Sequence, residues 1–269
     1  MNAAENYVEI NRQSWNNKVA IHLESAFYDM PAFLSGKTSL NDIELKMLGD
    51  IKGKSILHLQ CHFGQDSISL NRLGAKVTGV DLSDKAIESA YQIAKETNSD
   101  ADFICCDIYD LPRHLDKKYD IVFTTYGTIG WLPDLDKWAN IIASFLKPGG
   151  QFIFVEFHPV VWMFDNNFEK IGYNYFNESA IIETESGTYA DKKANLTQEL
   201  ISWNHPVSEV LNSLIKNGLV INSLDEFDYS PYNCFNKMVE FEPKKFRIEK
   251  LGNKIPMVYS IVATKKIKD

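Results

Sequence analysis

Between residues 51 and 158, short apolar runs alternate with segments in which apolar residues recur at helical spacing. The apolar runs predict five strands, at residues 55–59, 75–80, 101–106, 119–125 and 151–157. The segments between them predict helices at residues 65–73, at 84–97 with a cap at Ser83 or Asp84, and at 134–146. Strands that alternate with helices of about a dozen residues form βαβ units, so the pattern predicts a mostly parallel sheet.

The alternation stops at His158-Pro159. Residues 159–203 are rich in aromatic residues and contain a hairpin-like run, IIETESGTYA, in which Ser186-Gly187 is the expected turn. We interpret this segment as an insertion after the fifth strand, either a lid or a small β subdomain. A helix at 207–216 and strands at 219–227 and 257–264 follow, whereas residues 228–256 show no regular pattern.

These elements predict one α/β domain over residues 1–269. Its doubly wound, seven-stranded, mostly parallel sheet has helices on both faces and the aromatic-rich, β-containing insertion after the fifth strand. Residues 5–27 predict one or two amphipathic helices outside the sheet, within an N-terminal helical cap over residues 1–50. Residues 51–158 form the ligand-binding half, and residues 204–269 supply the final helix and the last two strands.

Charge and composition narrow the class of ligand. The chain has 28 Lys and Arg against 36 Asp and Glu, a net charge of −8. The basic groups Lys244-Lys245 to Arg247 and Lys265 to Lys268 are read as solvated surface, so the balance disfavours nucleic acid and favours a small-molecule partner. No apolar run approaches the roughly 20 residues that span a bilayer, and none follows a basic start.

Four cysteines without a CxxC pair suit free thiols in a reducing compartment: Cys61, Cys105, Cys106 and Cys234. We therefore expect a cytoplasmic protein. No set of residues has metal-ligand spacing, so no metal site is expected.

Polar residues stand at the predicted carboxyl ends of the strands, where a doubly wound sheet binds its ligands. Asp81 ends the second strand, 17 residues after Gly64 in the loop that follows the first strand. That distance suits an acid that accepts both ribose hydroxyls. Asp107 ends the third strand in the same way. The alternatives are a helix cap or a loop carboxylate for Asp81 and, for Asp107, a turn toward Leu111-Pro112.

Taken together, the runs ILHLQCHFGQD, VTGVDLS, FICCDIYDLP, YDIVFTTYGTIGWL and FLKPGGQFIFVEFHP resemble the successive motifs of class I methyltransferases that use S-adenosylmethionine (SAM). The resemblance covers residues 51–158, and residues 206–264 fit the family's final helix and two strands. The family's first loop reads hydrophobic-acid-hydrophobic-Gly-x-Gly-x-Gly. This chain keeps only Gly64, with His58, Gln60 and His62 in place of the acid and the first two glycines. Either the loop amides approach SAM less closely, or the Gln60 side chain supplies contacts itself.

The resemblance implies roles for individual residues. Asp81 would bind the ribose of SAM, or of the product S-adenosylhomocysteine (SAH), and Leu82, with Ser83 beside it, would flank the adenine. Asp107 and the Ile108 amide would bind the adenine edge. The expected contacts of the methionine part and the sulfonium are Gln60, Cys61, Gly64, Thr125 and Tyr126. An N-terminal helix often crosses the cofactor pocket in similar methyltransferases, which implies contacts from Trp15 and His22.

The acceptor side is less defined. SAM carries an electrophilic methyl group, so the protein must align the acceptor and, where it bears a proton, provide a base. His158 and Tyr126 are the catalytic candidates, and Trp131, His158 and His205 are candidates for contact with the acceptor. The alternatives are a loop histidine that orders the insertion, a packing tyrosine and, for His205, a helix cap.

The sequence thus favours methyl transfer to an oxygen, nitrogen or sulfur atom of a small molecule. One alternative is a non-catalytic SAM- or SAH-binding module or sensor. Another is a reductase that binds a nicotinamide cofactor. The reductase is disfavoured because G-x-G-x-x-G is missing and because LKPGG before the fifth strand is typical of methyltransferases.

Overall fold

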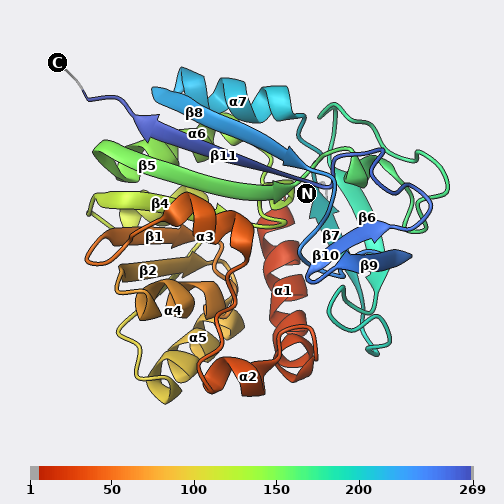
Figure 1. The fold of residues 1–269 in the computed structure, drawn as a ribbon, viewed down its shortest axis with the longest axis horizontal. Helices are drawn as coiled ribbons and strands as arrows, with labels where there is room; N and C mark the ends of the chain where they lie inside the picture. Colours follow the sequence, from red (N-terminus) through yellow and green to blue (C-terminus); the bar gives the residue numbers. More distant parts are fainter. Residues whose placement is uncertain (1–5, 268–269) are drawn as a thin grey trace.

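A computed structural model describes residues 6–267 and contains a seven-stranded sheet (Figure 1). Its strands are β1 (Ser55–Leu59), β2 (Lys76–Asp81), β3 (Asp102–Cys105), β4 (Tyr119–Thr125), β5 (Leu146–Phe157), β8 (Leu219–Phe227) and β11 (Val258–Lys265). The order is β3-β2-β1-β4-β5-β11-β8. The first five strands are parallel, and β11 runs antiparallel to both of its neighbours. The predicted doubly wound, mostly parallel sheet is therefore confirmed.

Helices cover both faces of this sheet (Figure 1). They include α4 (Gln65–Arg72), α5 (Asp84–Glu96), α6 (Leu135–Phe145) and α7 (Val207–Lys216). One core forms between the sheet, α6 and α7, and centres on the fully buried Trp138. The other forms on the opposite face with α4 and α5. Ser83 caps α5 by accepting a hydrogen bond from the amide of Ala86, as expected for a serine at this position.

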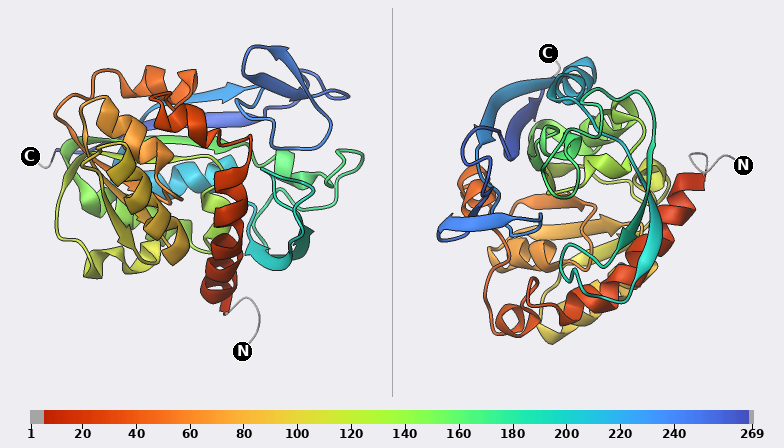
Figure 2. Two further views of the ribbon diagram at one scale, coloured as in Figure 1. Left: turned by 90° about the horizontal axis from the view of Figure 1, so that it is seen from below. Right: turned by 90° about the vertical axis from the view of Figure 1, so that its right-hand side faces the viewer.

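Three helices precede the sheet: α1 (Tyr7–Glu24), α2 (Met30–Leu34) and α3 (Asp42–Leu48). The predicted amphipathic region 5–27 is mostly the single helix α1; residue 5 lies outside the described residues. The buried side of α1 is mostly polar and comprises Asn11, Ser14, Lys18, Val19 and His22. The reason is its position, because α1 crosses the carboxyl edge of the sheet instead of packing on an apolar face (Figure 2).

The insertion contains the antiparallel strands β6 (Ile181–Ser186) and β7 (Thr197–Ser202). Ser186-Gly187 does not form the expected tight turn, because residues 187–196 connect the two strands. The side-chain amide of Asn11 donates to the carbonyl of Ile201 at 2.8 Å and accepts from its amide at 3.0 Å. Strand β7 is therefore fixed along α1.

Residues 228–256 are more regular than expected, since they contain an antiparallel hairpin of β9 (Met238–Glu242) and β10 (Lys245–Ile248). Most of β9 is exposed, so no buried face marks it in the sequence. Short 3-10 helices lie at Ile108–Arg113, Ile129–Trp131 and Val161–Met163. Among residues 6–267, no helix has the length and apolarity to cross a bilayer. Of the basic tail, Lys268 lies outside the described residues.

Candidate cofactor site

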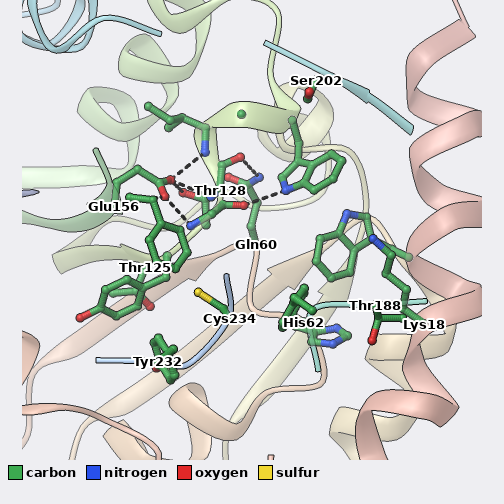
Figure 3. A pocket seen from close by; sticks show the side chains of 18 of the residues that line it. Lys18, Gln60, His62, Thr125, Thr128, Glu156, Thr188, Ser202, Tyr232 and Cys234 are labelled. Carbon is green, nitrogen blue, oxygen red and sulfur yellow. Dashed lines mark hydrogen bonds between the residues drawn. The ribbon is translucent and has the colours of Figure 1, made fainter. Parts of the chain in front are cut away.

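A cavity of about 860 Å³ lies at the carboxyl edge of the sheet, between the strand ends, α1 and the insertion (Figure 3). Its volume is in the upper part of the range of about 300–1,000 Å³ found for small-molecule sites. Most residues singled out from the sequence line it, namely Trp15, Gln60, Cys61, Gly64, Asp81, Leu82, Asp107, Ile108, Thr125, Tyr126, Trp131 and His205. Three of the proposed residues, His22, Ser83 and His158, are not part of its lining.

The loop after β1 has the backbone conformation of a glycine-rich loop, although two of its three positions with positive φ carry side chains. Gln60 and His62 have φ values of 54° and 50°, and Gly64 has 79°. Residues with a Cβ disfavour this left-handed region, and such strained positions tend to cluster at functional sites. The Gln60 amide nitrogen donates to the carbonyl of Thr128 at 2.8 Å, whereas its oxygen is buried without a partner. The Gln60 side chain therefore ties this loop to the loop after β4.

His58 stands where the similar family has an acid. It is buried, and its Nδ1 lies 2.8 Å from the Ser67 hydroxyl. Burial lowers the pKa of His58 to about 3, so the ring is neutral at physiological pH. The end of β1 thus carries no charge.

Asp81 is held by the backbone on both sides. One carboxylate oxygen accepts from the His62 amide at 2.7 Å, and the other accepts from the Ser83 amide at 2.9 Å. Burial raises the pKa of Asp81 to about 6, despite these hydrogen bonds. Since a carboxylate has about four lone-pair sites, two remain for a pair of ligand hydroxyls. The cap of α5 is Ser83 and not Asp81.

Ser83 itself is turned away from the cavity. Its hydroxyl accepts from the Ala86 amide and donates to Asn16 of α1 at 2.6 Å. Asp107 both turns the chain and lines the cavity, the two roles considered for it from the sequence. One of its oxygens accepts from the Tyr109 amide at 2.8 Å at this turn. Tyr7 of α1 is a further lining residue that the sequence reasoning missed.

Glu156, near the end of β5, was also missed. Its buried carboxylate accepts from the amides of Thr128 and Ile129 at 2.7 and 3.1 Å, and from the amide of Gly127 (Figure 3). Trp131 reinforces this loop by donating its indole N–H to the Gly127 carbonyl at 2.7 Å. Glu156 therefore shapes the loop after β4, and an acid within the apolar run FIFVEF was the only signal for it.

His158 is placed outside the cavity. Its Nε2 lies 3.0 Å from a carboxylate oxygen of Glu226 on β8, and its Nδ1 accepts from the Val160 amide at 3.2 Å. Both nitrogens thus order the start of the insertion, which was the alternative interpretation of this residue. His205 does line the cavity, but its nitrogens contact the Leu132 carbonyl at 2.8 Å and Glu209 at 3.1 Å.

His22 lies on the buried side of α1, against the loop after β1. Its Nδ1 lies 3.0 Å from Nε2 of His62, and its own Nε2 is buried without a partner. Burial lowers the pKa of both rings, that of His22 to about 3. The two neutral rings link α1 to the first loop.

Tyr126 lines the cavity directly after β4, with a φ of 40°. Its hydroxyl donates to Glu44 of α3 at 2.9 Å, and Glu44 is completely buried. Burial, with a smaller effect from Asp66, raises the pKa of Glu44 to about 7. Three more tyrosines line the cavity, and we call the set Tyr28, Tyr126, Tyr189 and Tyr232 the tyrosine compartment.

No group of His, Cys, Asp and Glu suited to hold a metal ion occurs within residues 6–267. The charged groups that line the cavity are carboxylates and lysines, among them Lys18, whose ammonium pairs with Glu185 at 2.9 Å.

Comparison with known proteins agrees with this geometry. Residues 56–150 match the model of a family described as a methyltransferase domain. A ubiquinone biosynthesis O-methyltransferase of Coxiella burnetii is 31% identical over 118 residues, which are 43% of this chain and 50% of the relative. The chain thus spans about half the length of these curated relatives. A protein of the same name from Proteus mirabilis is 25% identical, over 80% of this chain and 86% of the relative.

Among solved structures, a putative SAM-dependent methyltransferase from Listeria monocytogenes superposes with a TM-score of 0.57 at 24% identity. The superposition covers 82% of this chain and 95% of that protein, and at this identity it establishes the fold. The match over residues 56–150 covers β1 to the first part of β5, the region that carries Asp81 and the first loop. Residues 56–150 are therefore similar to a methyltransferase domain, and the chain has the fold of the class I SAM-dependent methyltransferases.

Proposed function

We propose that this protein binds SAM in the cavity and transfers its methyl group to an oxygen, nitrogen or sulfur atom of a small molecule. The observation that carries the proposal is Asp81, a carboxylate fixed by two backbone amides at the carboxyl end of β2, with free lone pairs at the cavity. SAM supplies the electrophilic methyl group when it is bound.

The residues around Asp81 fit the rest of the cofactor. Leu82 and Ile108 offer apolar surface for the adenine, and Asp107 offers an acceptor for its amino group. Gln60 and Thr125 line the part of the cavity assigned to the methionine end, where the Gln60 oxygen still lacks a partner. Trp15 of α1 covers the loop after β1, since its ring lies 5.2 Å from that of His62. With SAM bound, this cover would keep water away from the sulfonium.

Tyr126 and Glu44 are the proposed proton acceptors. An acceptor O–H or N–H would pass its proton to the Tyr126 oxygen while the Tyr126 proton moves to Glu44, 2.9 Å away. A pKa of about 7 for Glu44 suits a base at neutral pH. His158 is not assigned as the base, because its two ring nitrogens contact Glu226 and the Val160 amide.

The acceptor is proposed to be a small molecule with an apolar, ring-sized part. The tyrosine compartment offers ring faces and hydroxyls, and Phe27 stacks on Tyr232 with ring centroids 5.5 Å apart. The name of the curated relatives favours oxygen as the accepting atom.

Isothermal titration with SAM and with SAH tests the proposal. We expect micromolar binding of both, and a loss of at least tenfold, about 1.4 kcal/mol, in Asp81→Ala. Asp110→Ala is the control, because it removes an exposed carboxylate that pairs with Arg113 at the surface. No binding of either ligand to folded wild-type protein would refute the proposal. Binding without turnover of any acceptor would favour the sensor interpretation instead.

A further inference from the structure

The amino-acid end of SAM poses a charge problem in this cavity. SAM carries a positive α-ammonium group besides its sulfonium, and a charged group taken out of water needs an opposite charge or several hydrogen bonds. The position at which similar methyltransferases have an acid is His58, which is neutral and already bonded to Ser67. The first loop therefore offers no carboxylate for this ammonium.

Asp66 is a carboxylate two residues after that loop, in the first turn of α4. It lines the cavity, and one of its oxygens lies 3.3 Å from the Thr125 hydroxyl at the end of β4. None of the ion pairs within residues 6–267 includes Asp66, although burial raises the pKa of its carboxyl. The carboxylate thus faces the cavity without a cation.

The other carboxylates near the cofactor are engaged elsewhere. Glu156 accepts from the amides of the loop after β4, and Glu185 pairs with Lys18. Glu44 is bonded to Asn41 and Tyr126 and does not line the cavity. Asp81 is assigned to the ribose. Asp66 is therefore the available anion beside Thr125, at the end of the cavity where the methionine part of SAM is expected.

We propose that Asp66 binds the α-ammonium group of SAM and so replaces the acid that the first strand of this chain lacks. This inference rests on the proposed function, since it assigns one more residue to the same cofactor. Asp66 is a binding residue and takes no part in the transfer itself. Its position at the first turn of α4 also suits a negative charge, because the helix dipole is positive there.

The test compares two ligands on two variants by isothermal titration. SAH has the amino-acid part, and 5′-methylthioadenosine lacks it but keeps the adenosine and the sulfur. In Asp66→Asn, which keeps the shape and removes the charge, we expect SAH to bind at least tenfold more weakly and 5′-methylthioadenosine within twofold of wild type. Asp81→Asn is the matched control, and it should weaken both ligands because both contain the ribose.

A third ligand, the deamino analogue of SAH, separates the ammonium from the carboxylate. Its affinity should be the same for wild type and Asp66→Asn. If Asp66→Asn weakens SAH and 5′-methylthioadenosine equally, or does not weaken SAH, the assignment of Asp66 is refuted. The proposed function would not be affected by either result. Absence of SAH binding to wild-type protein would refute the proposed function, and the assignment with it.

A measurement on the wild-type protein covers the case in which Asp66→Asn fails to fold. With ¹³C-labelled aspartate, the carboxyl carbon of Asp66 is followed by NMR as the pH is changed. SAH should move its titration to lower pH, because the bound ammonium stabilises the carboxylate, whereas 5′-methylthioadenosine should not. The same titration with both ligands would overturn the proposal.

Discussion

Glu44 makes the stability of this protein depend on pH in a way that a single substitution reveals. Its side chain is fully buried in α3, where it accepts from the Asn41 amide at 2.7 Å and from Tyr126. Burial is the main cause that raises the pKa of Glu44 from 4.5 to about 7. Glu44→Gln keeps the shape of the side chain and its acceptor for Asn41, but it removes the titration.

The sign follows from the direction of the pKa change. A raised pKa means that folded Glu44 holds its proton more tightly than the unfolded chain does. Its contribution to the free energy of unfolding is then fully present below pH 4.5 and is lost as the pH rises to about 7. At about 1.4 kcal/mol for each pKa unit, the loss amounts to about 3 kcal/mol. The side chain introduced by Glu44→Gln does not titrate, so the free energy of unfolding of the variant rises relative to that of wild type over this pH range.

Urea denaturation of both proteins between pH 4.5 and pH 8 measures the effect. The free energy of unfolding of Glu44→Gln, minus that of wild type, should rise by about 3 kcal/mol from the lowest to the highest pH. Other carboxyls with raised pKa values are present in both proteins and cancel. Glu88→Gln is the control, because Glu88 is exposed on α5 and pairs only with Lys85. A difference that stays constant with pH would refute the burial argument.

Two further predictions concern the framework of the site. Gly64→Ala should lower the free energy of unfolding by about 1–3 kcal/mol more than Gly53→Ala in urea titrations. Gly64 and Gly53 have similar φ values, 79° and 77°, but only at Gly64 would the new Cβ lie 2.7 Å from the Phe103 ring. Equal losses would therefore contradict the packing argument. Asn11→Ala should cost about 2 kcal/mol or more and speed hydrogen exchange at the Ile201 amide, which loses its buried acceptor. Unchanged exchange there would show that β7 does not depend on α1.

The sequence predicted the half of the fold in which strands are buried on both faces. Strand β4, for example, begins and ends at the residues expected from its apolar run. The prediction from sequence failed for strands that have no buried face, such as the exposed β9 of the hairpin at residues 238–248. Where a strand is not packed on the core, the alternation of apolar and polar residues that predicts strands is lost.

The site shows the same division. Asp81 and Asp107 could be found because a strand end fixes their position along the sheet. The environment of His158 could not be predicted, because Glu226 contacts it from β8, 68 residues away in the sequence. Asp66 and Glu44 are acids in helices, and nothing in their sequence neighbourhood distinguishes a buried carboxylate from an exposed one. These two carboxylates are distinguished only by the fold, which brings them against Thr125 and Tyr126 at the end of β4.

The attachment of β7 to α1 has a consequence for engineering. The insertion supplies many of the residues that line the cavity, so exchanging residues 159–203 with those of a similar protein is an obvious way to change its specificity. Asn11 and Lys18, however, supply the partners of Ile201 and Glu185 from a helix more than 160 residues earlier. A graft that leaves α1 unchanged would leave Lys18 buried without its carboxylate unless the new segment has an acid at the position of Glu185. It would also break both Asn11 hydrogen bonds unless the new strand lies where β7 does. The unit of exchange is therefore the insertion together with α1.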